Sequence, residues 1–300
     1  MDREGEIMRV TILGGIANAL LLVFKFLAGI LGHSSAMIAD AVHSLSDFLT
    51  DIIVIIFVHI SGKPQDDSHD YGHGKYETLA TSVIGLALVV VAAGIFYNGA
   101  TKILDWARGG ELTAPGMLAF WAAIASIAVK EAVYRYTVAV GKRLDSKAVV
   151  ANAWHHRSDA FSSVATALGI GCAIFLGRRW AVLDPVASIV LGAFVLKMGW
   201  DLVRDGVGEL LEESLPEEVE NRILAIVTEF PDVTEPHHLR TRRIGNRYAI
   251  EMHLRMNGDI SLREAHSKAS QIEKRLKDEF GPQTHIGLHL EPEKSNGGED

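Results

Sequence analysis

The chain has 300 residues, of which 48% are hydrophobic and 22% are charged, and its formal net charge at pH 7 is −8. Its positive mean hydropathy excludes an ordinary soluble domain, and its excess of acidic residues argues against nucleic acid as a partner. The single cysteine, Cys172, excludes both an intrachain disulfide and a metal site built from cysteines.

Apolar stretches dominate the first two thirds of the chain and predict an α-helical membrane protein with six transmembrane helices. They cover roughly residues 8–31, 36–60, 79–104, 116–140, 160–176 and 182–203. With a rise of about 1.5 Å per residue, each can cross a hydrocarbon core of about 30 Å. The first stretch is too long for the core of a signal peptide, so we interpret it as a retained helix. Six spans place both termini on one side, and the lysines and arginines of the loops favour the cytoplasm for that side.

The second stretch carries ionisable side chains where a membrane helix is expected to have none. His43, Asp47 and Asp51 follow one another at intervals of four residues, and Asp40 lies three residues before His43. A helix therefore presents all four on one stripe. An aspartate at membrane depth costs about 2.5–3.5 kcal/mol on insertion scales, so such groups face a bundle interior or a water-filled cavity and usually mark an ion path.

A second copy of this spacing appears at the start of the fifth stretch. His155 and Asp159 are again four residues apart, whereas His156 points to a different side of the helix. Two helices that each offer one imidazole and one carboxylate can close a tetrahedron around one divalent cation, an arrangement that suits Zn²⁺. We therefore predict that His43, Asp47, His155 and Asp159 form one metal site.

Other charged residues in the spans have structural explanations. Lys25 in the first span is expected to snorkel to the interface or to hydrogen-bond within the bundle. Lys130, Glu131 and Arg135 in the fourth span are expected to be interfacial or internally paired. None of the four is assigned a role in ion movement.

The loop after the second span contains a second group of potential ligands. These are Asp66, Asp67, His69, Asp70 and His73. The spacing of Asp66, His69 and His73 can wrap one metal ion if the backbone turns at Gly72 and Gly74. A solvated acidic loop with incidental histidines explains the same residues equally well.

The composition changes from membrane to soluble near Gly206. Beyond it the signals predict a helix from Pro216 to about Phe230 and then strand, strand, helix and strand at about 237–244, 247–256, 261–280 and 284–291. This αββαβ order indicates a small ferredoxin-like α+β domain with two helices on one face of the sheet. We expect a transmembrane domain at 1–208, a cytoplasmic domain at 209–292 and a disordered tail at 293–300.

Alternation along the last strands predicts which residues face the helices. Apolar residues at 250, 252, 254, 256, 286, 288 and 290 alternate with polar ones that include His253, His289 and Glu291. The polar set should lie together on the opposite face, where His237 or His238 can join it. This face is either a solvated surface with histidines, or a metal cluster or partner interface.

These motifs together resemble the cation diffusion facilitator transporters, in particular the bacterial zinc-exporter (YiiP-like) branch, over about residues 8–292. The matching segments are HSLSD at 43–47, the loop at 66–77 with its GHGKYE, HHRSD at 155–159 and HHLRTR at 237–242. Any one of these segments is a weak signal, but all four in this order, together with six spans, are a strong one.

The resemblance implies roles for several residues. The four-residue site would be the transport site, and Asp66, His69 and His73 would form a loop site. A cytoplasmic cluster that bridges two subunits of a homodimer would consist of His237, His253, His266, His289 and Glu291. Lys75 would pair with Glu212 in the ion pairs that hold the dimer. The chain departs from the branch at His43 and Glu291, where aspartates are usual, and His238, His285 and Asp51 are additional.

The resemblance also implies a Zn²⁺/H⁺ antiporter that exports zinc from the cytoplasm across the inner membrane by alternating access. Because Zn²⁺ binds neutral imidazole and ionised carboxylate, loading the site expels protons, and histidine's ordinary pKa of about 6.5 places this competition near physiological pH. Efflux of Fe²⁺, Co²⁺, Cd²⁺ or Mn²⁺ by the same mechanism is an alternative, and a metal-gated channel or sensor is another. An enzyme is not expected, because the chain has no H-E-x-x-H motif and four protein ligands leave no place for a reactive water.

Overall fold

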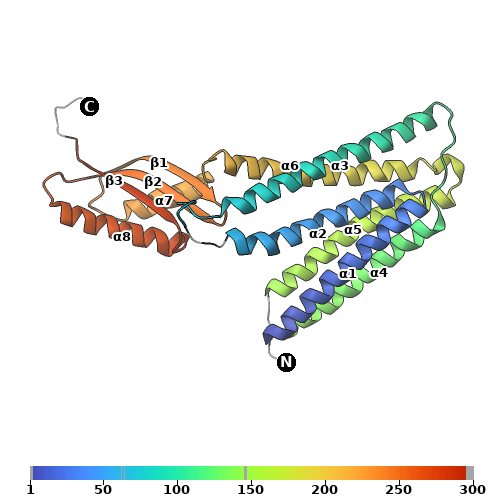
Figure 1. The fold of residues 1–300 in the computed structure, drawn as a ribbon, viewed down its shortest axis with the longest axis horizontal. Helices are drawn as coiled ribbons and strands as arrows, with labels where there is room; N and C mark the ends of the chain where they lie inside the picture. Colours follow the sequence, from blue (N-terminus) through green and yellow to red (C-terminus); the bar gives the residue numbers. More distant parts are fainter. Residues whose placement is uncertain (1–2, 62, 64, 145–146, 295–300) are drawn as a thin grey trace. The chain divides into compact units, whose positions relative to one another are not determined.

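The computed structural model describes residues 3–61, 63, 65–144 and 147–294 (Figure 1). Most of the predicted tail therefore lies outside the described residues. So do some side chains within the helices, among them those of Asp51, His155 and His156. The chain divides into two compact units, which we call unit 1 (Met1–Ile52 with Val83–Leu202) and unit 2 (Ile53–Ser82 with Val203–Asp300).

Long helices account for the predicted apolar stretches. They are α1 (Arg3–Leu31), α2 (Ser35–Ser61), α3 (Lys75–Ala107), α4 (Met117–Arg143), α5 (Lys147–Phe175) and α6 (Leu183–Leu210), with a short 3₁₀ helix at Arg178–Trp180 before α6. By length and composition, α1, α3, α4 and α6 are each able to cross a membrane. The apolar part of α5 among the described residues, Asp159–Phe175, is shorter than these four helices. Six spans remain a prediction.

Small residues allow the helices of unit 1 to pack closely around α2. Ala36 and Met37 of α2 are buried in one apolar cluster with residues of α1, α4 and α5. Ala39 and Val42 are buried in a second cluster with residues of α3 and α6. In unit 1, α1 runs beside α4, and α4 beside α5 (Figure 1). The helix with the polar stripe therefore shares a buried apolar cluster with every other long helix of the unit.

The first turn of α2 is hydrogen-bonded to a residue at the start of α6, far away in the sequence. Asp184 at the start of α6 is only 3% exposed, and its carboxylate accepts hydrogen bonds from the main-chain N–H groups of Ser35 and Ala36 and from the hydroxyl of Ser34. The hydroxyl of Ser34 in turn accepts from the N–H of Met37. These bonds satisfy N–H groups that the first turn of a helix otherwise leaves without partners.

Unit 2 contains the predicted αββαβ order. The elements are α7 (Glu217–Thr228), β1 (Glu235–Ile244), β2 (Arg247–Met256), α8 (Leu262–Phe280) and β3 (His285–Pro292). The sheet order is β1-β2-β3, with β1 antiparallel and β3 parallel to β2. Gly245 adopts a φ of +61° in the hairpin between β1 and β2, a conformation that favours glycine.

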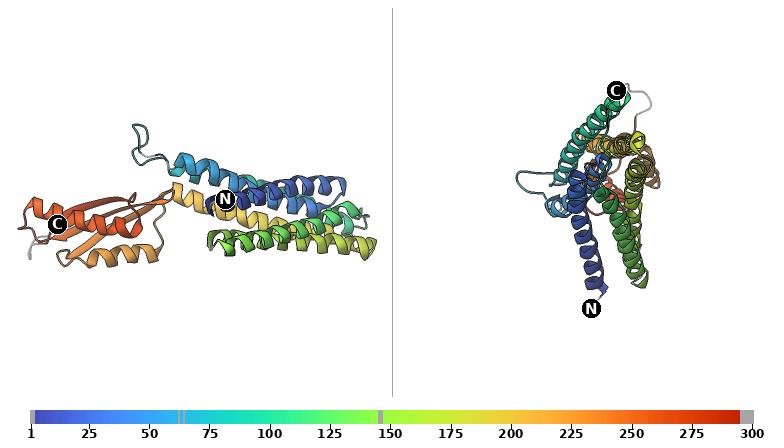
Figure 2. Two further views of the ribbon diagram at one scale, coloured as in Figure 1. Left: turned by 90° about the horizontal axis from the view of Figure 1, so that it is seen from below. Right: turned by 90° about the vertical axis from the view of Figure 1, so that its right-hand side faces the viewer.

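The core of unit 2 confirms the predicted alternation. Ile250, Met252, Leu254 and Met256 of β2 are buried in one apolar cluster with residues of α7 and α8. Both helices therefore cover the same face of the sheet, and the strands lie beside them in Figure 2. The other face of β2 and β3 is left to the polar residues of the strands.

Candidate metal centres

Three side chains from α2 and α5 converge in unit 1. His43, Asp47 and Asp159 each offer one ligand atom, and these atoms all lie within 4.8 Å of one another. All three residues are half-buried. One imidazole and two carboxylates at this separation can enclose a divalent cation.

A second observation indicates that His43 is a metal ligand. Its Nδ1 atom is buried and has no hydrogen-bond partner within the part of the chain that the structure describes. Buried polar atoms of native proteins almost always have a partner, so such an atom needs an explanation. A bound cation supplies one, which supports the fit of this site to a metal ion.

His155 was predicted as the fourth residue of this site, but its side chain lies outside the described residues, as does that of Asp51. The helix α5 does run without interruption from Lys147 to Phe175, so the four-residue interval to Asp159 is helical as predicted. The role of His155 as a ligand stays a prediction.

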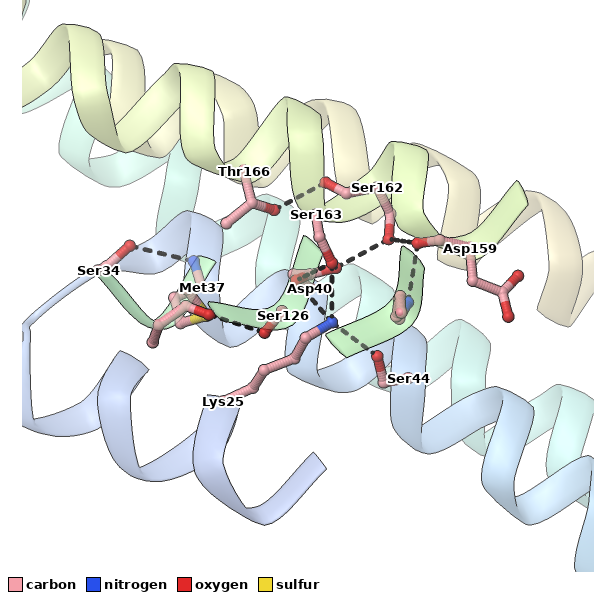
Figure 3. A network of polar contacts seen from close by, with 12 residues as sticks. Lys25, Ser34, Met37, Asp40, Ser44, Ser126, Asp159, Ser162, Ser163 and Thr166 are labelled. Carbon is pink, nitrogen blue, oxygen red and sulfur yellow. Dashed lines mark hydrogen bonds and ion pairs between the residues drawn. The ribbon is translucent and has the colours of Figure 1, made fainter. Parts of the chain in front are cut away.

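Asp40 is on the predicted stripe but contacts Lys25. The Lys25 ammonium lies 2.7 Å from the Asp40 carboxylate, and both side chains are fully buried. Lys25 also donates to the hydroxyls of Ser44 and Ser163 (Figure 3). The prediction that Lys25 hydrogen-bonds within the bundle is confirmed. The Asp159 carboxylate points away from this network, as Figure 3 shows.

The charges of α4 are internally paired. Lys130 is 5% exposed and donates to the main-chain carbonyl of Asp159 at 2.8 Å. Arg135 lies one turn from Glu131 and donates to it at 2.8 Å. Lys130 is thus buried and hydrogen-bonded within the bundle.

Two cavities adjoin the site in unit 1. A small one of about 30 Å³, close to the volume of a single water molecule, has Ser44, Asp47, Lys130 and Asp159 in its lining. A larger one of about 430 Å³ is lined by His43 together with residues of α5 and α6, including Met198 and Asp201. His43 thus lies at the wall of the larger cavity, and Asp47 and Asp159 lie at the wall of the smaller one.

The loop residues form a second group, in unit 2. Asp66, His69 and His73 bring their ligand atoms within 4.8 Å of one another. Hydrogen bonds from Ser68 hold the pKa of Asp66 down at about 2, so its carboxylate is ionised at neutral pH. The Nδ1 atom of His73 is buried without a hydrogen-bond partner among the described residues. The chemistry of these three ligands fits a metal ion.

One aromatic residue of this loop site was missed in the sequence. The hydroxyl of Tyr76 lies 3.2 Å from Nε2 of His69, and its ring stacks on His73 with the centroids 5.7 Å apart. The signal was its place one turn after His73 at the start of α3. Asp67 and Asp70 are exposed and do not join the group.

A third group lies on the polar face of the sheet. His237, His253 and Glu291 have ligand atoms within 4.8 Å of one another, as expected from the alternation. Glu291 accepts from Nδ1 of His253 at 2.8 Å and lies 3.2 Å from Nε2 of His237. The hydrogen bond from His253 is the main cause of the lowered pKa of Glu291. His289 lies at the edge, with its ring 4.7 Å from that of His253.

The remaining histidines of unit 2 have different surroundings. His238 has a φ of +51° and lies next to the cluster, with its ring 5.2 Å from that of His253. His285 instead contacts the ring of Tyr71. His266 is exposed on α8, which covers the opposite face of the sheet, so it does not join the cluster of its own chain. Its predicted role would require a second subunit.

The predicted partners Lys75 and Glu212 form an ion pair within unit 2. Arg242 binds the same carboxylate at 2.9 Å. Partial burial tends to raise the pKa of Glu212, but the hydrogen bonds and charges of Lys75 and Arg242 outweigh it and lower the pKa. Glu212 is therefore an anionic link between the start of α3 and strand β1.

Comparisons with known proteins identify the family of this chain. Residues 11–211 match the family model of the cation efflux transmembrane domain, and residues 215–293 match that of the cation efflux protein cytoplasmic domain. The manganese efflux system protein MneP of Bacillus subtilis (strain 168) is 30% identical over 295 residues, which are 97% of this chain and 98% of that protein.

Two further likenesses are more limited. The magnetosome protein MamB of Magnetospirillum gryphiswaldense is 28% identical over 276 residues, covering 92% of this chain and 91% of that protein. Among solved structures, the metal-bound C-terminal domain of the CzcD transporter from Thermotoga maritima is 30% identical. The match covers 26% of this chain and 92% of the solved domain, with a TM-score of 0.25.

Proposed function

The chain belongs to the cation diffusion facilitator family of divalent-metal efflux transporters, and we propose that it exports Zn²⁺ from the cytoplasm in exchange for protons. The observation that carries this proposal is the convergence of His43, Asp47 and Asp159 from two helices in a bundle of apolar helices. Ionisable groups at such a place are expected to face an ion path.

Proton exchange follows from the chemistry of the ligands. A divalent cation binds ionised carboxylate and neutral imidazole, so loading requires His43, Asp47 and Asp159 to be free of additional protons. Protons arriving from the other side of the membrane compete for the same atoms and favour release. Exposure of the site to each side in turn would then couple metal efflux to proton entry.

Zinc is the proposed cargo because of the donor set. With His155 added, the site offers two nitrogen and two oxygen ligands, which suits tetrahedral Zn²⁺. A second candidate is Mn²⁺, favoured by the likeness to MneP over nearly the whole chain. Fe²⁺, Co²⁺ and Cd²⁺ are alternatives by the same mechanism, because ligand type alone does not determine which ion is carried in a cell.

The proposed setting is a homodimer in the inner membrane. Each subunit would cross the bilayer six times, with its transmembrane domain at 1–208, its cytoplasmic domain at 209–292, and both termini in the cytoplasm. Asp66, His69 and His73 would hold one resident metal ion, and His237, His253, His289 and Glu291 another, with His266 from the second subunit. A resident ion would supply cross-links between strands, loop and subunits rather than chemistry, so no enzymatic activity is proposed.

Transport into proteoliposomes under an imposed pH gradient tests the proposal. Zn²⁺, Mn²⁺, Fe²⁺ and Cd²⁺ are compared for the wild type and Asp159→Ala. We expect saturable, gradient-driven uptake with Zn²⁺ preferred, and loss of uptake in the variant. A non-saturating flux that ignores the gradient would support a channel, and unchanged flux in Asp159→Ala would remove this residue from the site.

A preference for Mn²⁺ in the same experiment would select the second candidate. That result would leave the efflux mechanism in place, because the gradient and the Asp159→Ala variant report on the site and not on the cargo. Metal-dependent hydrolysis without any transport would favour an enzyme instead.

A further inference from the structure

Buried charges surround the metal site of unit 1 in two distinct arrangements. The first is the Lys25–Asp40 pair, in which both partners are fully buried and 2.7 Å apart. Hydroxyls of Ser162 and Ser163 also donate to Asp40 (Figure 3). This pair is neutral as a unit, so it joins α1, α2 and α5 without adding net charge to the site.

The second arrangement is Lys130, which is placed against the metal ligands themselves. Its ammonium donates to the main-chain carbonyl of Asp159 at 2.8 Å, and Lys130 shares with Asp47 and Asp159 the lining of the 30 Å³ cavity. Lys25 repels this buried ammonium, whereas Asp40, Asp159 and Asp47 attract it. The hydrogen bond to the carbonyl therefore holds a cation beside the two carboxylates.

We propose that Lys130 is a fixed counter-ion of the transport site. Its positive charge partly neutralises the two carboxylates when no metal is bound, and it repels the metal ion when one is bound. With neutral imidazoles, Asp47, Asp159 and Lys130 carry a net charge of −1 without metal and +1 with a divalent cation. Without the lysine, these values would be −2 and 0. Lys130 thereby lowers the affinity of the site for the metal ion and makes release of the ion easier. This inference rests on the proposed function.

The hydrogen bond and the charge of Lys130 can be separated by substitution. Lys130→Gln removes the charge but keeps a donor on a shorter side chain, Lys130→Met removes both, and Lys130→Arg keeps both. Lys102→Met is the matched control, because Lys102 donates to the hydroxyl of Ser35 at 2.6 Å. Ser35 begins α2 and lies about 18 Å along the helix from Asp47.

The experiment measures Zn²⁺ and Mn²⁺ binding to the full-length protein in nanodiscs by calorimetry, and transport in proteoliposomes. The transport-site isotherm is identified as the one that Asp47→Ala abolishes. We expect Lys130→Gln and Lys130→Met to bind metal more tightly by tenfold to a hundredfold, an order of magnitude set by one unit charge close to a divalent ion. Both should also transport with a lower maximal rate.

Lys130→Arg should stay within about threefold of the wild type, and Lys102→Met should leave binding unchanged. A purely structural lysine would weaken binding when removed, so tighter binding is the result that separates the two roles. Unchanged or weaker binding in whichever neutral variant retains the wild-type melting behaviour would overturn the inference. If Asp47→Ala abolishes no isotherm, the proposed transport site itself fails, which is a different outcome.

Discussion

The buried ion pair between Lys25 and Asp40 makes a sharp prediction about stability. Both side chains are 0% exposed, with their charged atoms 2.7 Å apart. Removing one partner of such a pair leaves an uncompensated buried charge and costs about 3–5 kcal/mol, whereas replacing both partners is close to neutral. Because Ser162 and Ser163 still donate to Asp40, we expect Lys25→Met to cost about 3 kcal/mol, at the lower end of this range.

The assay is thermal unfolding in detergent, followed by tryptophan fluorescence. All five tryptophans precede residue 203, so the signal reports on unit 1. A loss of about 3 kcal/mol corresponds to a fall in melting temperature of about 6–12 °C. The double variant Lys25→Met/Asp40→Asn, which restores neutrality, should recover most of the lost melting temperature.

Arg135→Met serves as the control, because Arg135 is 77% exposed in its ion pair with Glu131. An exposed pair one turn apart contributes less than about 1 kcal/mol. The reasoning is refuted if the double variant is as unstable as Lys25→Met, since the unpaired charge would then not be the cause. It is also refuted if Lys25→Met melts no lower than Arg135→Met.

Three further outcomes are expected, each with its own measurement. His73→Gln should lower the metal bound per chain by about one equivalent in elemental analysis while transport persists; complete loss of transport would show that the loop site is not merely resident. Hydrogen bonds from Arg222 and Arg275 hold the pKa of Glu279 at about 2, below its ordinary value of 4.5. Between these two pH values the unfolded chain binds more protons at Glu279 than the folded chain does, so the stabilisation from this carboxylate is lost as the pH falls from 4.5 to 2. Circular dichroism should therefore show Glu279→Gln melting below the wild type at pH 6 but level with it near pH 2, and an equal gap at both pH values would contradict this. Gly74→Ala should loosen the loop and release its metal, because a Cβ there would lie 2.6 Å from the Ile244 carbonyl oxygen, whereas Gly94→Ala meets nothing within 4 Å and should be neutral.

Much of the candidate site could be predicted from local spacing. The four-residue interval that places His43 and Asp47 on one stripe depends only on the geometry of the helix, and the structure brings both together with Asp159. Alternation along β2 likewise predicted which side chains meet the helices and which, including His253, lie on the polar face.

Other residues could not be assigned in this way. Asp40 shares the stripe of His43 but binds Lys25 of another helix, and Lys130 reaches the carbonyl of Asp159. Asp184 is 150 residues from Ser34, which donates to it at the start of α2. No periodicity within one segment contains these pairings.

For the ligands that the structure brings together, the sequence by itself determined the residue types, the helices and strands that carry them, and the face on which each one lies. These features follow from repeats of 3.6 and 2 residues within a segment. Only the tertiary structure decided which buried charge neutralises which. That choice depends on how close small residues allow the helices to approach, and on the need of every buried charge for a partner within hydrogen-bonding distance.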